Sequence, residues 1–126
     1  MKWSMEVNEE KGVIVITLLG RWDAGGIFEA LELLWKEQVR TGILRVLWDF
    51  REIDAVGVST SKIREVASRQ LTVRPDLPES KAAVVVSGDL EFGLARMAEA
   101  FIAQSPADMQ IFRKLSEANA WLNEGG

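Results

Sequence analysis

Apolar and polar side chains alternate at the start of the chain, where Trp3, Met5 and Val7 are separated by polar residues. This period of two predicts a half-buried strand over residues 3–7. A polar turn follows and ends at Gly12. Residues 13–19 are apolar and mostly β-branched on both faces, which is typical of a central strand. The pattern therefore predicts that the chain opens with an antiparallel hairpin.

Four later segments carry apolar residues at the spacing of a helix. The first lies between Asp23, a candidate N-cap, and Gly42, a candidate C-cap. The second opens at the hydroxyl residues 59–61 and is ended by Pro75 and Pro78. The third and fourth helices are predicted over residues 90–104 and 115–122.

Three further apolar runs, at residues 43–50, 81–86 and 109–112, predict inner strands, and residues 51–58 are predicted as a loop. The resulting order is β-β-α-β-α-β-α-β-α. Strands that alternate with helices imply right-handed crossovers and a parallel sheet. We therefore predict a single α/β domain over residues 1–126, with a five-stranded, mostly parallel sheet whose first strand is antiparallel to the second.

The composition excludes several kinds of chemistry. The chain has no Cys, so it has no disulfide, thiol nucleophile or thiolate zinc site. It also has no His, which removes the commonest general base and the Ser–His triads. No phosphate-binding glycine motif occurs. We therefore expect a protein that is not an enzyme and that has no cofactor or metal site.

The charge balance and the hydropathy pattern indicate where the protein works. Lys and Arg total 15 against 19 Asp and Glu, a net charge of −4, which argues against nucleic-acid binding. The first residues lack the apolar core of a signal peptide, and no apolar run reaches transmembrane length. We expect a soluble cytoplasmic protein that does not insert into a membrane.

Candidate binding residues follow the predicted inner strands. In an open α/β sheet, ligands and partners usually meet the edge formed by the carboxyl ends of the parallel strands. The side chains expected at this edge are Arg21, Trp22, Asp49, Arg51, Ser59, Ser87, Asp89 and Arg113.

Several short strings, in this order and spacing, carry a resemblance that covers nearly the whole chain. They are GRWD at 20–23, LRVLWD at 44–49, FGLARM at 92–97, and FR at 112–113 with AWL at 120–122. With the element order, they resemble the SpoIIAA-like (STAS/SEC14-like) family of small bacterial STAS-fold proteins. The resemblance implies a STAS-like fold with a regulatory or interaction role, and no established chemistry.

The same resemblance points to Ser59. In signalling STAS proteins, a partner kinase phosphorylates a serine at the start of the second helix. Asp49 matches the acidic residue that ends the preceding strand, and counting onward places that serine near Val58 or Ser59. The family's Asp-Ser-Ser-Gly-like string is replaced here by GVSTS at 57–61. Ser59 is therefore a candidate phosphoacceptor, and the alternative is an ordinary helix N-cap.

Two other groups have more than one interpretation. Asp49, Glu52 and Asp54 could hold Mg²⁺ or act as an acid–base pair, or they could lie in a solvated loop with pairing to Arg51. The apolar residues of the third helix spread beyond one stripe. They could pack on the sheet, form a dimer surface or line an apolar pocket, and the residues in question are Phe92, Met97 and Phe101.

These observations favour a non-enzymatic regulatory or protein-interaction module of the STAS type, with a protein partner or a second copy of the chain as its ligand. The alternative is a carrier that binds a lipid or another small apolar molecule under the third helix. A third hypothesis is an enzyme that works with Asp, Glu, Ser, Lys and Arg alone.

Overall fold

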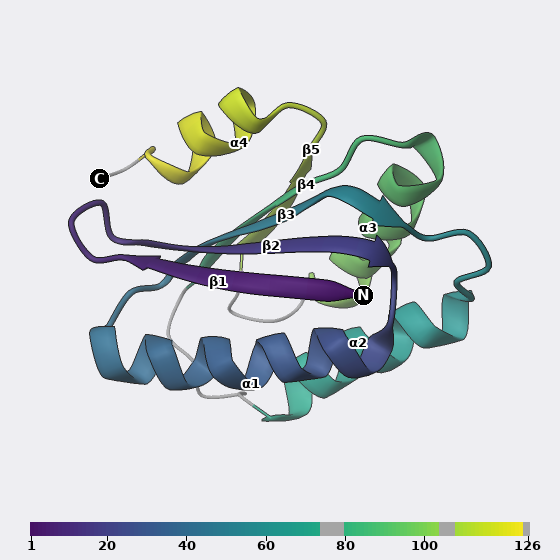
Figure 1. Cartoon of the computed structure of the whole chain (residues 1–126), viewed down its shortest axis with the longest axis horizontal. Coiled ribbons are helices and arrows are strands. Elements are labelled where there is room, and N and C mark those ends of the chain that lie inside the picture. The colour runs from purple at the N-terminus through teal and green to yellow at the C-terminus, as the bar shows by residue number, and fades with distance from the viewer. Residues whose placement is uncertain (74–79, 104–107, 125–126) are drawn as a thin grey trace.

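Strands and helices alternate along the chain after an opening hairpin (Figure 1). The computed structural model describes residues 1–73, 80–103 and 108–124. The predicted order of elements is confirmed. The elements are β1 (Lys2–Asn8), β2 (Val13–Arg21), α1 (Ala24–Thr41), β3 (Arg45–Asp54), α2 (Thr60–Val73), β4 (Lys81–Val85), α3 (Asp89–Phe101), β5 (Asp108–Phe112) and α4 (Leu115–Leu122).

The sheet has five strands in the order β1-β2-β3-β4-β5. β1 runs antiparallel to β2, while β2, β3, β4 and β5 are parallel to one another. The mostly parallel sheet and its antiparallel first strand are therefore confirmed. Because each parallel strand returns through a helix, β2 to β5 all end at the same edge of the sheet, which we call the carboxyl edge.

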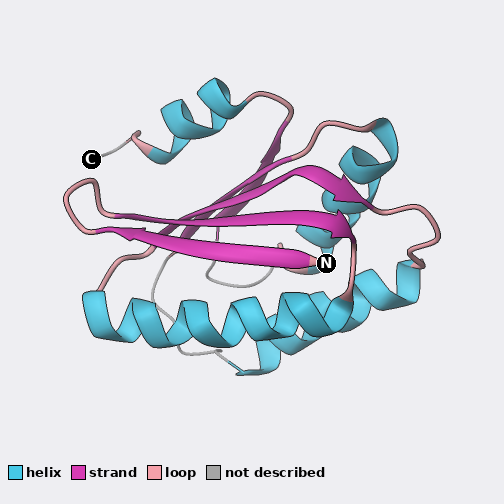
Figure 2. Ribbon diagram, in the orientation of Figure 1, coloured by secondary structure: helices cyan, strands magenta, loops and turns pink. Residues whose placement is uncertain are grey.

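Helices cover the two faces unequally (Figure 2). α1, α2 and α3 pack on one face, and the short α4 packs on the other. The pleat of β4 shows why both faces need cover: Ala82 and Val84 join the larger core, whereas Ala83 and Val85 face α4. Lys81 fastens the end of α4, because its Nζ donates to the Trp121 carbonyl at 2.9 Å.

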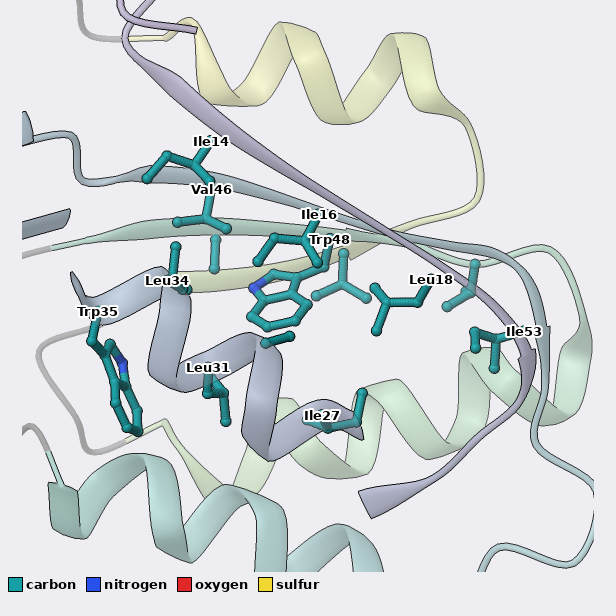
Figure 3. Close-up of a cluster of buried hydrophobic side chains, with 14 of the residues drawn as sticks. Ile14, Ile16, Leu18, Ile27, Leu31, Leu34, Trp35, Val46, Trp48 and Ile53 are labelled. Atoms are coloured by element: carbon teal, nitrogen blue, oxygen red, sulfur yellow. The ribbon is translucent and has the colours of Figure 1, made fainter. Parts of the chain in front are cut away.

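The main core lies between the sheet and α1 (Figure 3). Ile14, Ile16 and Leu18 are alternate residues of β2, and all three are fully buried. Their side chains point toward α1, and the Trp48 ring fills the space between β3 and that helix. The period of two in the strand and the helical spacing of α1 therefore meet in one apolar layer.

Both ends of α1 agree with the sequence. The Asp23 carboxylate accepts a hydrogen bond from the Gly26 N–H at 3.0 Å, so Asp23 is the N-cap. Gly42 ends the helix with a φ of 74°, a conformation that glycine adopts without strain. The prolines at 75 and 78 lie outside the described residues. The third helix was predicted to reach residue 104, and α3 instead ends at Phe101.

The prediction of a loop from residue 51 was wrong over its first part, because β3 continues to Asp54. The pairing of β2 with β3 is irregular after Thr17 and then resumes, with Leu19 opposite Glu52 and Arg21 opposite Asp54. The neighbouring strand thus holds the polar end of β3 extended. β3 begins at Arg45, two residues later than predicted.

Candidate functional site: the carboxyl edge and the cavity beside it

The carboxyl edge brings together residues from four segments of the chain. Arg21 ends β2, and the Trp22 N–H donates to the Asp54 carbonyl at 2.9 Å, which ties the β2 exit to the end of β3. Ser59 precedes α2, and Ser87 lies between β4 and α3. This arrangement follows from the parallel order of β2 to β5.

Asp89 and Arg113 meet at this edge, as their position after β4 and β5 allows. Arg113 Nη1 lies 2.7 Å from Asp89 Oδ1, and the guanidinium lies 4.3 Å from the centre of the Phe92 ring. Both charged side chains are solvent-exposed, so the ion pair adds little stability. Its main effect is that a cation covers one side of Phe92.

Asp49 and Arg51 lie inside β3 rather than in a loop at the edge. Leu47 faces α4 whereas Trp48 and Phe50 join the main core, so Asp49 faces the α4 side of the sheet. Arg51 Nε and Nη2 donate to the two carboxylate oxygens of Asp49 at 2.9 and 2.8 Å. This bidentate pair lowers the pKa of Asp49 from its usual value.

Replacing Asp49 with Asn should lower the free energy of unfolding at pH 7 by about 1 kcal/mol, a figure reduced by the partial exposure of Arg51. The pKa of Asp49 is lower in the folded protein than its ordinary value of 3.8. The stabilisation is therefore complete above that value and is lost as the pH falls through the folded-state pKa. Urea titrations between pH 7 and about pH 2 check this, and a pH-independent difference from wild type would contradict it.

The acidic residues of β3 do not gather into a metal site. Asp49 is engaged by Arg51, and Asp54 Oδ1 accepts a hydrogen bond from the Val56 N–H at 3.0 Å. Within residues 1–73, 80–103 and 108–124, no three acidic side chains come close enough to hold a metal ion together. In the same ranges no helix has the length and apolar character needed to cross a bilayer.

Ser59 stands at the start of α2 and caps it. Its Oγ accepts a hydrogen bond from the Lys62 N–H at 3.3 Å and lies 3.1 Å from Ser61 Oγ. Its carbonyl accepts from the N–H groups of Lys62 and Ile63. The capping role expected of a hydroxyl at this position is therefore present, and Ser59 is solvent-exposed. Phosphorylation of Ser59 stays a prediction.

Two exposed apolar side chains stand at the carboxyl edge and were not among the predicted site residues. Val56, after β3, is 62% exposed, and Leu90, in the first turn of α3, is 47% exposed. We call this pair the edge patch. The Ala55 N–H donates to Glu91 Oε2 at 3.2 Å, and each patch residue is next in sequence to one of these partners. Val56 and Leu90 therefore flank the hydrogen bond that joins the loop after β3 to the first turn of α3.

Beside this edge, between the sheet and the three-helix layer, lies a cavity of about 120 Å³. The sheet contributes Trp48, Val84 and Ile111 to its wall, and α3 contributes Leu94, Ala95 and Ala98. Trp22, Ala55 and Glu91 line it from segments that follow the ends of β2, β3 and β4. Glu91 is the single charged residue among the lining residues that the structure describes.

The residues singled out on the third helix have other surroundings. The lining of the cavity does not include Phe92, Met97 or Phe101. Phe101 lies 5.2 Å from the Arg64 guanidinium, on the side of α2. The sequence signal for Glu91 is its place on the apolar stripe, three residues before Leu94 and seven before Ala98. A carboxylate on that stripe points toward the core, and Glu91 was not among the site residues predicted from the sequence.

A comparison with solved structures identifies the fold. An uncharacterised protein of the DUF3478 family from Shewanella loihica, described as having a SpoIIAA-like fold, superposes with a TM-score of 0.60. The match covers 96% of this chain and 92% of that chain at 17% sequence identity. This chain has a SpoIIAA-like fold. At that identity the SpoIIAA-like likeness extends to the fold alone, so function has to be argued from the site.

The comparisons at the level of sequence add no family. No family model matches the chain, and no curated protein matches it. The SpoIIAA-like fold predicted from the sequence is confirmed by the structural match and by the element order.

Proposed function

We propose that this chain is a non-enzymatic regulatory or protein-interaction module that works in the cytoplasm and binds its partner at the carboxyl edge. The observation that carries the proposal is the edge patch. Val56 and Leu90 leave 62% and 47% of their surfaces in water at the edge where open α/β sheets meet their ligands. Exposed apolar side chains that gather at one edge of a folded domain favour a protein contact there.

The edge patch is also held in place before any partner arrives. The hydrogen bond from Ala55 to Glu91 joins the loop after β3 to the first turn of α3. Surfaces that are ordered in advance lose less conformational entropy on binding. The exposed Ser59 follows in the same loop, so a charge added there would alter the patch's surroundings.

The double replacement Val56→Asp with Leu90→Asp tests this surface. We expect it to weaken partner binding at least tenfold, because carboxylates would have to be desolvated at the contact. The matched control is Val39→Asp. Val39 is 70% exposed and lies near the C-terminal end of α1, whereas the N-terminal end of α1 follows the carboxyl edge. Self-association is measured by sedimentation velocity, and binding of a captured partner by titration with each variant.

A partner or a second copy that binds the edge variant and the wild type equally would contradict the proposed surface. If Val39→Asp weakened partner binding as much as the double edge variant does, the proposed surface would be contradicted too, because the effect would then come from the added charge alone. Asp49→Asn serves as a further comparison, since the alternation of β3 places that residue on the α4 side of the sheet.

A second candidate function is the binding of a small apolar molecule, and the cavity favours it. Its volume of about 120 Å³ is below the roughly 300 Å³ at which pockets for drug-sized ligands begin. A lipid does not fit such a space, whereas a single ring does. The carrier hypothesis is therefore narrowed to molecules of that size.

A further inference from the structure

The cavity has the size of one aromatic ring. Its volume is about 120 Å³, and a buried apolar cavity of about 150 Å³ in another protein is large enough to bind benzene. The cavity is partly open to solvent, and its almost wholly apolar wall holds an ordered water poorly, because such a water needs several polar partners. A small apolar molecule would gain the contacts that the empty space lacks.

The wall of the cavity suits a flat, polarizable ligand. Trp48 and Phe50 both line it, and their rings are stacked with centroids 6.0 Å apart and planes 15° apart. Trp22 contributes a third aromatic ring, and Met109 a thioether. Aromatic and sulfur groups interact favourably with another aromatic ring at such distances.

Glu91 gives the cavity one polar end. Its Oε2 accepts the Ala55 N–H at 3.2 Å, and Oε1 stands so close to Gly88 that a Cβ on that glycine would collide with it. A carboxylate offers about four acceptor positions, so one hydrogen bond leaves it able to accept more. Because an ionised carboxylate has no donor of its own, the group that completes it must be an O–H or an N–H.

We infer that the cavity binds a single-ring aromatic molecule that carries one hydrogen-bond donor, with the ring against Trp48 and the donor on the Glu91 carboxylate. The inference rests on the second candidate function, the binding of a small molecule, and adds the ligand's chemistry. A wholly apolar cavity would favour a plain hydrocarbon, because a hydroxyl group without a partner loses its hydrogen bonds to water. The carboxylate reverses that preference.

Phenol and toluene make the sharpest pair of probes. They have nearly the same shape, and only phenol has a donor. Binding of each is measured by calorimetry at neutral pH, and amide shifts of Leu94 and Ala98 show whether the probe occupies the cavity. In the wild type, we expect phenol to bind at least as tightly as toluene. In Glu91→Met, the affinity ratio of phenol to toluene should fall about tenfold, because a hydrogen bond to a charged group is lost.

The matched control is Glu99→Met on the same helix, because Glu99 pairs with Arg96 and does not line the cavity. It should leave the ratio unchanged. Toluene binding by Glu91→Met shows that the cavity has survived the loss of the contact with Ala55. If that binding is absent, Glu91→Gln takes its place, since the amide oxygen can still accept the Ala55 N–H. The ratio should again fall, though by less, because a neutral amide forms a weaker hydrogen bond with phenol than a carboxylate does.

The outcomes separate the role of Glu91 from the existence of a small-molecule site in the cavity. A wild-type preference for toluene, or a ratio that no Glu91 variant changes, would overturn the role of Glu91 and leave the small-molecule site standing. Failure of both probes to bind the wild type would overturn the site as well. Neither result would bear on the edge patch, whose test uses a protein partner and other residues.

Discussion

Ile16→Ala is expected to lower the free energy of unfolding by about 3–4 kcal/mol, more than any other single truncation proposed for this chain. Ile16 is 0% exposed and lies in β2 between its neighbours β1 and β3. Its side chain faces α1 beside the Trp48 ring, in the middle of the main core (Figure 3). The loss combines the hydrophobic transfer energy of the removed carbons with the cavity that they leave.

Leu19→Ala is the matched control, because it removes an apolar side chain of similar size from the same strand. Leu19 is 42% exposed, so we expect a loss below about 1 kcal/mol. Urea titrations followed by tryptophan fluorescence measure both variants, and a shift in the midpoint at constant slope reports stability alone. Equal losses would contradict the assignment of the α1 face of β2 to the core.

Local patterns predicted this part of the fold because each depends on neighbours in sequence. Residues 13–19 are apolar on both faces, which predicted a central strand, and β2 lies between β1 and β3 with Ile14, Ile16 and Leu18 fully buried. Asp23 and Gly42 mark the ends of α1 because a capping carboxylate and a left-handed glycine act within one turn of the helix. The order of elements then leaves few topologies for a parallel sheet.

The errors and omissions depend on contacts between distant segments. Residues 51–54 were predicted as a loop, and three of the four are charged, yet pairing with the end of β2 extends β3 through them. Asp49 was considered as part of a solvated loop, but it lies within β3 on the α4 side, where the expected pairing with Arg51 is present. Contacts between distant segments join some of the candidate residues: Arg113 pairs with Asp89 and covers the Phe92 ring, and the Trp22 N–H donates to the Asp54 carbonyl.

The sequence suggested an apolar pocket under the third helix as one alternative but did not indicate which residues line it, because empty space is a property of packing between elements rather than of any segment. Its wall combines residues of β3, β4, β5 and three helices. Glu91 was the one local signal, as a charge on the apolar stripe of α3. Recognising its role required the position of Ala55, which is 36 residues away in sequence.

Ala98→Leu should raise the free energy of unfolding by about 1–2 kcal/mol, since it adds three carbon atoms where space is empty. Ala98 lies on α3 and lines the cavity of about 120 Å³. Leucine is also a good helix former, so the backbone of α3 should tolerate the change. Both stability and probe binding should respond, because the larger side chain takes the place of a bound ring. Phenol and toluene should therefore both lose affinity.

The same alanine-to-leucine substitution on the other face of the sheet should lower the free energy of unfolding rather than raise it. Ala83 is 0% exposed in β4, packed in the smaller core under α4. Ala83→Leu would overfill that contact and cost about 1–3 kcal/mol, with α4 forced away from the sheet. Urea titration of the two variants side by side gives the comparison, since residue type and added volume are identical. If Ala98→Leu destabilised the protein as much as Ala83→Leu does, the space beside Trp48 would not be a cavity that a ligand can enter.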